Sequence, residues 1–168
     1  MAFHYSIPSM LQESLRELAA VAEYCVTYQK DLRTWGSHGC YGYPAAILLL
    51  SIADSIGSYV IGGDVKEHFD ILSHPNYYNL SLDKESIDII YKNYRCLLTH
   101  HSAMAFEATL GIGKENEPVF EITRGKPLLR LSPFLRITKE VVETFLKKAD
   151  IIVPSSEGFK EIRKRSTL

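Results

Sequence analysis

An arginine and a histidine stand five positions apart in the segment from Tyr91 to His101. Arg95 is a permanent cation whose forked N–H donors match the oxygens of a phosphate group. A histidine such as His100 can accept and release a proton near neutral pH. These two side-chain types suit phosphodiester chemistry, in which one group holds the phosphate and another moves a proton. We therefore take Arg95 and His100 as the candidate catalytic pair.

The spacing of the pair does not bring the two side chains together directly. On an ideal α-helix, residues five apart differ by about 140° around the axis and about 7.5 Å along it. Apolar residues occupy the arc between them at helical spacing: Ile87, Ile90, Tyr91, Tyr94, Leu97 and Leu98. The pair can converge if the helix loosens near Thr99, or if two copies of the helix meet across a two-fold axis.

The segments before the motif are expected to be helical. Apolar residues recur at helical spacing from Ser9, a candidate N-cap, to about Leu32. A nearly all-apolar helix is expected from 45 to 61, with Pro44 in its first turn. The glycine pair at 62–63 ends it, and a short helix follows over 65–72.

The motif helix begins at Ser81 or Asp83, both of which are good helix caps. Residues 106–112 have an extended pattern, and 119–131 are typical of a β-hairpin. Thr138 is expected to cap the last helix. The predicted fold class is mainly α, an up-and-down bundle of four or five helices with a small β-hairpin inserted before the last long helix.

The bulk composition is that of a single globular domain. The chain has 168 residues, 46% of them hydrophobic, and a net charge of −1. We expect one domain over 1–168, with a core at about 9–150 and a basic tail at 155–168. The near-zero charge provides no global attraction to nucleic acid, so any RNA contact must come from a local basic patch or a dimer groove.

Several features favour a cytoplasmic location without a membrane anchor. The first residues lack the basic and apolar regions of a signal peptide. The longest apolar run, Ala45 to Leu50, is too short to cross a bilayer. The three cysteines, Cys25, Cys40 and Cys96, are odd in number and widely spaced, as is typical of reduced thiols.

One acid, Asp54, lies in the middle of the apolar helix. A buried carboxylate needs a cation or strong hydrogen bonds. Asp54 therefore either orients Arg95 for function or forms a purely structural contact between helices. Under the structural alternative, His100 and His101 only stabilise the end of their helix.

The helix order together with the Arg95-x4-His100 motif resembles the HEPN superfamily of helical domains over about residues 9–150. In that superfamily the motif lines a cleft between two HEPN units. The resemblance implies that Arg95 holds the phosphoryl group and that His100 is the general acid/base while a ribose 2′-hydroxyl attacks. It implies no metal and no cofactor. A homodimer is expected both from the resemblance and because residues 45–61 and the motif helix have more apolar surface than one small bundle easily covers. It also implies a ribonuclease of a toxin or antiviral defence system.

Two positions depart from the superfamily pattern. The residue after the arginine is commonly polar, often asparagine, in catalytic members, but here it is Cys96, and Asn93 lies three residues before it. This departure weakens the ribonuclease interpretation. A branch that works with nucleotidyltransferases has a tyrosine two residues after the histidine, where this chain has Ser102. That difference argues against that branch.

Four basic residues cluster in sequence around the hairpin: Arg124, Lys126, Arg130 and Arg136. They form either a solvated face or a patch that follows the phosphates of a nucleic acid beside the Arg95/His100 cleft. A metal site is not expected, because the potential ligands show no metal-ligand spacing: His38, Cys40, His68, His74, His100 and His101.

Three classes of function remain open from the sequence. The first is a metal-independent endoribonuclease with Arg95 and His100 in one dimer cleft. The second is a non-catalytic HEPN-like module that binds nucleic acid, nucleotide or a cognate protein partner. The third is a purely structural dimer in which Arg95 serves Asp54 and His100 lies elsewhere. Fold-level analogy alone does not decide among them.

Overall fold

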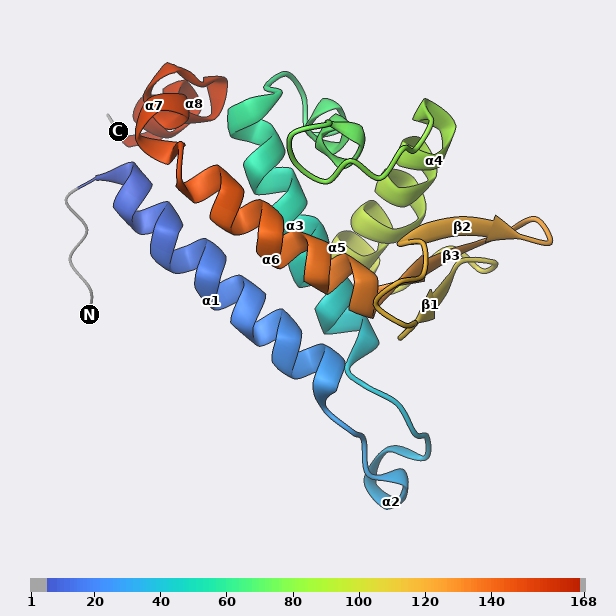
Figure 1. Ribbon diagram of the computed structural model, residues 1–168. Coiled ribbons are helices and arrows are strands. Elements are labelled where there is room, and N and C mark those ends of the chain that lie inside the picture. Colours follow the sequence, from blue (N-terminus) through green and yellow to red (C-terminus); the bar gives the residue numbers. More distant parts are fainter. Residues whose placement is uncertain (1–5, 167–168) are drawn as a thin grey trace.

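The apolar helix α3 (Gly42–Val60) is the centre of the fold (Figure 1). In this computed structural model, which describes residues 6–166, α3 packs against α1 (Ile7–Thr27) and against the later helix α6 (Leu131–Leu146). Buried residues lie on several sides of α3, among them Ala46, Leu49 and Ile56. Its apolar sequence is therefore explained by neighbours from the same chain.

Helix α1 begins and ends earlier than its sequence pattern predicts. Ser6, not Ser9, is the N-cap, and its Oγ accepts the Ser9 N–H at 3.3 Å. The prediction that the helix continues to Leu32 was wrong, because the chain turns away at Tyr28. There the Tyr28 ring stacks on Tyr41, with ring centroids 4.5 Å apart. Residues 28–41 instead form an arm that carries the short helix α2 (Leu32–Trp35), at the bottom of Figure 1.

A 3₁₀-helix, η1 (Glu67–Ser73), follows the glycine turn where a short helix was expected at 65–72. The tight start has a local cause. The Asp64 carboxylate accepts the backbone N–H groups of Lys66 and Glu67 at 2.8 and 3.0 Å. The 3₁₀-helix η1 lies along α3, which places the side chains of η1 against the end of the apolar helix.

The motif helix has three parts: α4 (Lys84–Ile89), a π-helical stretch η2 (Ile90–Cys96), and α5 (Leu97–His101). Of the two predicted caps, Asp83 is the one used, and its Oδ1 accepts the Ser86 N–H at 2.8 Å. The helix ends at Ser102, which adopts a left-handed conformation.

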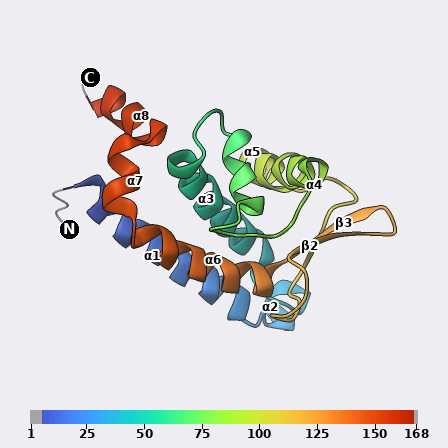
Figure 2. The ribbon, with the colours of Figure 1, turned by 45° about the horizontal axis from the view of Figure 1, so that its top comes forward.

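The predicted hairpin is confirmed and belongs to a three-stranded sheet. Strands β2 (Phe120–Thr123) and β3 (Lys126–Arg130) pair antiparallel around the Arg124–Gly125 turn. Strand β1 (Thr109–Gly111) pairs parallel with β3 on its other side, giving the order β1-β3-β2. The sheet and the C-terminal helices lie at opposite ends of the molecule (Figure 2).

The long helix α6 (Leu131–Leu146) follows β3 directly and packs on α1 and α3. The prediction that Thr138 caps this helix was wrong. Pro133 already stands in the first turn of α6, and Thr138 is fully buried in its interior. Helices α7 (Ala149–Ser155) and α8 (Glu157–Ser166) complete the described chain.

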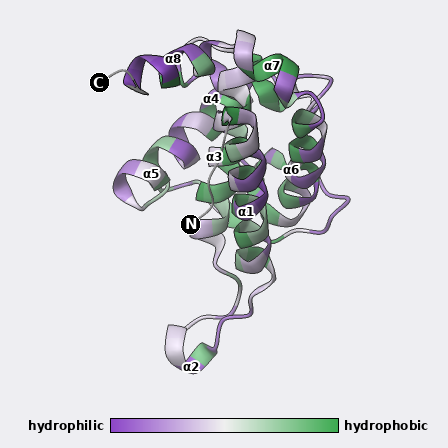
Figure 3. Ribbon diagram, turned by 90° about the vertical axis from the view of Figure 1, so that its left-hand side faces the viewer, coloured by the Kyte–Doolittle hydropathy of each residue, from purple (hydrophilic) through white to green (hydrophobic). Residues whose placement is uncertain are grey.

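The predicted fold class, mainly α with a small β insertion before the last long helices, is confirmed. The first five residues, where a signal-peptide pattern was sought, and the last two residues of the predicted basic tail lie outside the described residues. Helix α3 is long and apolar enough to cross a membrane, but the core helix of a soluble protein meets the same criterion. Figure 3 shows apolar residues on the packed helices α1, α3 and α6, and mostly hydrophilic residues on α8.

Candidate functional site

Asp54 of α3 contacts an arginine and a histidine side chain through its two oxygens. Its Oδ2 accepts a hydrogen bond from Arg95 Nη2 at 2.8 Å, and its Oδ1 lies 2.8 Å from His68 Nδ1. The three side chains are 18%, 22% and 13% exposed for Asp54, Arg95 and His68, so the cluster is shielded but reaches the surface. We call Asp54, His68 and Arg95 the Asp54 cluster.

His68 reaches Asp54 because η1 approaches α3 very closely at Gly57. A Cβ at Gly57 would overlap the backbone of His68, including its carbonyl oxygen, its carbonyl carbon and its Cα. Any larger residue at this position would push η1 away from α3. The absence of a side chain at Gly57 therefore sets the position of the His68 imidazole.

Arg95 reaches Asp54 from the π-helical part of the motif helix. In a π-helix the backbone hydrogen bonds join residues five apart, so a turn takes in an extra residue, and such turns are frequent at functional sites. Loosening near Thr99 was one of two ways in which Arg95 and His100 could converge, but the helix loosens earlier, over Ile90–Cys96. Tyr94 fixes this segment, because its buried hydroxyl reaches the carbonyl oxygens of Thr109 and Pro127 at 3.0 and 2.8 Å.

The predicted partner of Arg95, His100, does not belong to this cluster. His100 and His101 lie exposed in the last turn of α5. Within residues 6–166, the side chain of His100 makes no hydrogen bond or ion pair. In a single chain, the structure therefore brings Arg95 together with Asp54 and His68, and it leaves His100 in solvent.

Two further positions near the motif have local structural contacts. The Asn93 carbonyl oxygen accepts the Ala105 N–H at 3.3 Å, which folds the chain after α5 back along the motif helix. Cys96 is half-buried, and a hydrogen bond with Cys96 raises the pKa of the Tyr91 hydroxyl above its ordinary value.

The four basic residues around the hairpin do not form one open patch. Arg130 is 13% exposed and pairs with Glu117 and Glu121, while Arg136 pairs with Glu140 at 2.9 Å. Hydrogen bonding to Arg130 lowers the pKa of the Glu121 carboxyl. Two of the four cations are thus compensated by acids of the same chain.

The other two basic residues stand at the tip of the hairpin. Arg124 lies in the turn with a φ of 53°, and Lys126 begins β3; both are exposed. Any phosphate contact of this face therefore depends mainly on Arg124 and Lys126.

His68 is the residue of the cluster that sequence reasoning missed, because it was considered there only as a metal ligand. One weak signal was present: a chain that reverses at the Gly62–Gly63 turn returns along the helix it has just left. Among the described residues, no group of three or more His, Cys, Asp or Glu side chains is placed to hold a metal ion.

Comparisons with protein-family models, with curated proteins and with solved structures found nothing that matches this chain.

Proposed function

We propose that this chain is a HEPN-like helical domain that binds RNA and cleaves it without a metal ion, with Arg95 holding the phosphate. The observation that supports the proposal is the ion pair between Arg95 Nη2 and Asp54 Oδ2 at 2.8 Å. It fixes the arginine of the motif in a partly exposed position beside a histidine. The structural alternative, in which Arg95 serves Asp54 and His100 lies elsewhere, has the same arrangement within one chain, and it differs from this proposal in predicting neither binding nor cleavage of RNA.

Arg95 keeps most of its hydrogen-bonding capacity after it binds Asp54. A guanidinium group carries five N–H donors, and the ion pair with Asp54 uses the Nη2 end. The other donors can reach two oxygens of one phosphate in the forked geometry that arginine favours. Asp54 orients the fork and offsets part of its charge, so Arg95 is a phosphate-positioning group in this proposal.

The proposed cleavage moves two protons. A base removes the proton of the ribose 2′-hydroxyl while its oxygen attacks the adjacent phosphorus, and an acid protonates the departing 5′-oxygen. The products are a 2′,3′-cyclic phosphate and a 5′-hydroxyl, so this step consumes no water. We assign His100 to proton transfer, with a second copy of the chain bringing its own His100 and Arg95 to the same cleft.

A non-catalytic binding module is the alternative, and one observation favours it. His100 stands apart from the Asp54 cluster in the single chain. If no second copy brings His100 to the phosphate, Arg95 can bind RNA but no group is present to move the protons. Binding without cleavage is then the expected behaviour.

The test is cleavage of a mixed RNA pool in EDTA by the wild type and by the Arg95→Ala and His100→Ala variants. We expect cleavage by the wild type, with 2′,3′-cyclic phosphate ends, and loss of it in both variants. His74→Ala is the control, because His74 packs on Tyr77 with ring centroids 5.1 Å apart. Cleavage that persists in folded Arg95→Ala would reject the assignment of Arg95.

A further inference from the structure

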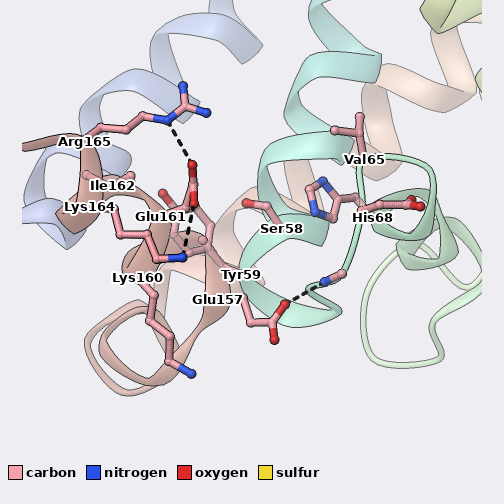
Figure 4. Close-up of a pocket in the computed structure, with 13 residues that line it drawn as sticks. Ser58, Tyr59, Val65, His68, Glu157, Lys160, Glu161, Ile162, Lys164 and Arg165 are labelled. Atoms are coloured by element: carbon pink, nitrogen blue, oxygen red, sulfur yellow. Dashed lines mark hydrogen bonds and ion pairs between the residues drawn. The ribbon is translucent and has the colours of Figure 1, made fainter.

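A cavity lies between α8 and the turn that joins α3 to η1 (Figure 4). Its volume is about 730 Å³. Ser58 and Tyr59 of α3 and His68 of η1 form one wall, and α8, which carries Lys160 among other residues, forms the other. The cavity therefore opens on the same histidine that contacts Asp54.

Two contacts hold the start of α8 in place beside the cavity. Glu157 Oε2 accepts the Gly63 N–H at 2.9 Å. Gly158 lies so close to α3 that a Cβ there would be 3.1 Å from Ser58 Oγ and 3.2 Å from the Ser58 carbonyl oxygen. The cavity wall is thus a packed structural feature and not merely a loose end of the chain.

The acids around the cavity are already engaged by donors of the protein. Glu157 accepts the Gly63 N–H, as described above. Glu161 lies 3.1 Å from Arg165 and 3.9 Å from Lys164. The Asp64 carboxylate accepts two backbone N–H groups at the start of η1. Their negative charge is therefore partly offset within the protein itself.

Two of the residues that line this space can still donate hydrogen bonds to a ligand. His68 uses Nδ1 toward Asp54, and its Nε2 carries an N–H as well when the ring is in the imidazolium form. The Lys160 ammonium makes no hydrogen bond or ion pair within residues 6–166. A site whose acids are engaged and whose remaining donors are an imidazolium and an ammonium is complementary to an anion.

We propose that this cavity binds a phosphate group of an RNA strand, with His68 Nε2 and Lys160 Nζ as donors. The inference rests on the proposed function for the choice of RNA as the ligand. His68 then contacts the RNA phosphate through Nε2 and Asp54 through Nδ1, and Asp54 in turn contacts Arg95. Free phosphate and nucleotides share this chemistry, and the test separates them from a strand.

The test follows the imidazole nitrogen signals of the ¹⁵N-labelled full chain by NMR. The probes are inorganic phosphate, a mononucleotide, and a short single-stranded RNA with 2′-O-methyl groups, which cannot undergo the proposed cleavage. We expect the RNA to shift the His68 Nε2 signal saturably, at concentrations where phosphate and mononucleotide do not. The His74 signal, which belongs to a residue outside the cavity, is expected to stay unchanged.

A charge reversal in α8 gives a second readout that does not depend on His68. We expect Lys160→Glu to weaken binding of the same RNA by about tenfold, a change of about 1.4 kcal/mol. Lys148→Glu, an exposed charge reversal before α7, is the matched control and should leave the affinity unchanged.

Two results would overturn the proposal. The first is RNA binding of full affinity in Lys160→Glu with no shift at His68. The second is an equal response of His68 to phosphate and to RNA at the same concentrations, which would assign the cavity to a small phosphorylated ligand. Because the modified RNA is not cleaved, the cavity site can be confirmed even if the wild type proves to have no ribonuclease activity, and the reverse also holds.

Discussion

Asp54 is a charged side chain in an otherwise apolar helix, and its two partners explain how the fold accommodates it. One oxygen faces Arg95 and the other faces His68, both at 2.8 Å. A shielded carboxylate that loses its partners is costly, whereas one that keeps them is roughly neutral for stability. Asp54 therefore couples the position of the motif arginine to that of a histidine from a different element.

Replacing Asp54 by Asn should destabilise the protein and loosen both partners. The amide cannot accept from both sides, so one donor is left unsatisfied, at a cost of about 1–3 kcal/mol. Urea unfolding measures the loss. Asp70→Asn is the control, because Asp70 pairs with Lys84 on the surface, where such a pair contributes about 1 kcal/mol or less. Equal effects of the two variants would contradict the shared role of Asp54.

Tyr94 gives a residue-scale prediction with a defined pH window. Burial raises the pKa of its hydroxyl to about 12 from the ordinary value of 10.0. The raised pKa means that the hydroxyl contributes fully below pH 10 and that this contribution is lost as the pH rises to about 12, at most about 3 kcal/mol. We expect the stability of the wild type to fall more steeply over this range than that of Tyr94→Phe. Parallel pH curves for the two proteins would contradict this.

At the scale of elements, local sequence signals located the starts of some helices and misplaced others. The side chain of Asp83 caps α4, as predicted. Thr138 is also a residue type that favours helix caps, but it lies within α6, because β3 passes directly into that helix at Leu131. The need of Asp54 for a cation could also be predicted, since burial of a lone charge is unfavourable whatever the fold.

The part that His68 plays could not be predicted in the same way. It depends on how closely η1 approaches α3 and on a π-helical stretch in the motif helix. Both are tertiary features that no short pattern in the sequence specifies.

Gly57 permits this close approach, so Gly57→Ala should separate η1 from α3. We expect a loss of about 1–3 kcal/mol, because the new Cβ meets backbone atoms that cannot move independently. The Asp54–His68 contact should be lost as well, which the NMR signals of the imidazole ring report. Gly42→Ala in the same helix is the control, since a Cβ there would lie at ordinary distances of 3.6 and 3.7 Å from two leucine side chains. No difference between the variants would show that the approach is not limited by Gly57.

At the scale of the whole molecule, the predicted homodimer needs an exposed apolar surface. Much of the apolar surface of α3 is covered within one chain, so α3 supplies less of that surface than its sequence implied. Phe106, just after the motif helix, is fully exposed instead. Its place near the end of α5 makes it the residue that we expect at the contact between two copies.

Sedimentation at increasing protein concentration tests this contact. We expect the wild type to associate, and Phe106→Ser to weaken association without changing the unfolding temperature, because an exposed ring contributes little to the fold. Ile122→Ser, which alters an exposed residue of β2, is the control. A wild type that remains monomeric at all concentrations would contradict the proposed dimer cleft.

The central claim is that the Asp54 cluster serves RNA phosphodiester chemistry, and one comparison tests it most directly. The wild type is incubated in EDTA with an RNA strand and with the same strand made entirely of 2′-deoxynucleotides. The account predicts that the RNA is cut, leaving 2′,3′-cyclic phosphate ends, and that the deoxy strand stays intact because it has no attacking hydroxyl. A folded wild type that leaves the RNA uncut, across many sequences, would contradict it.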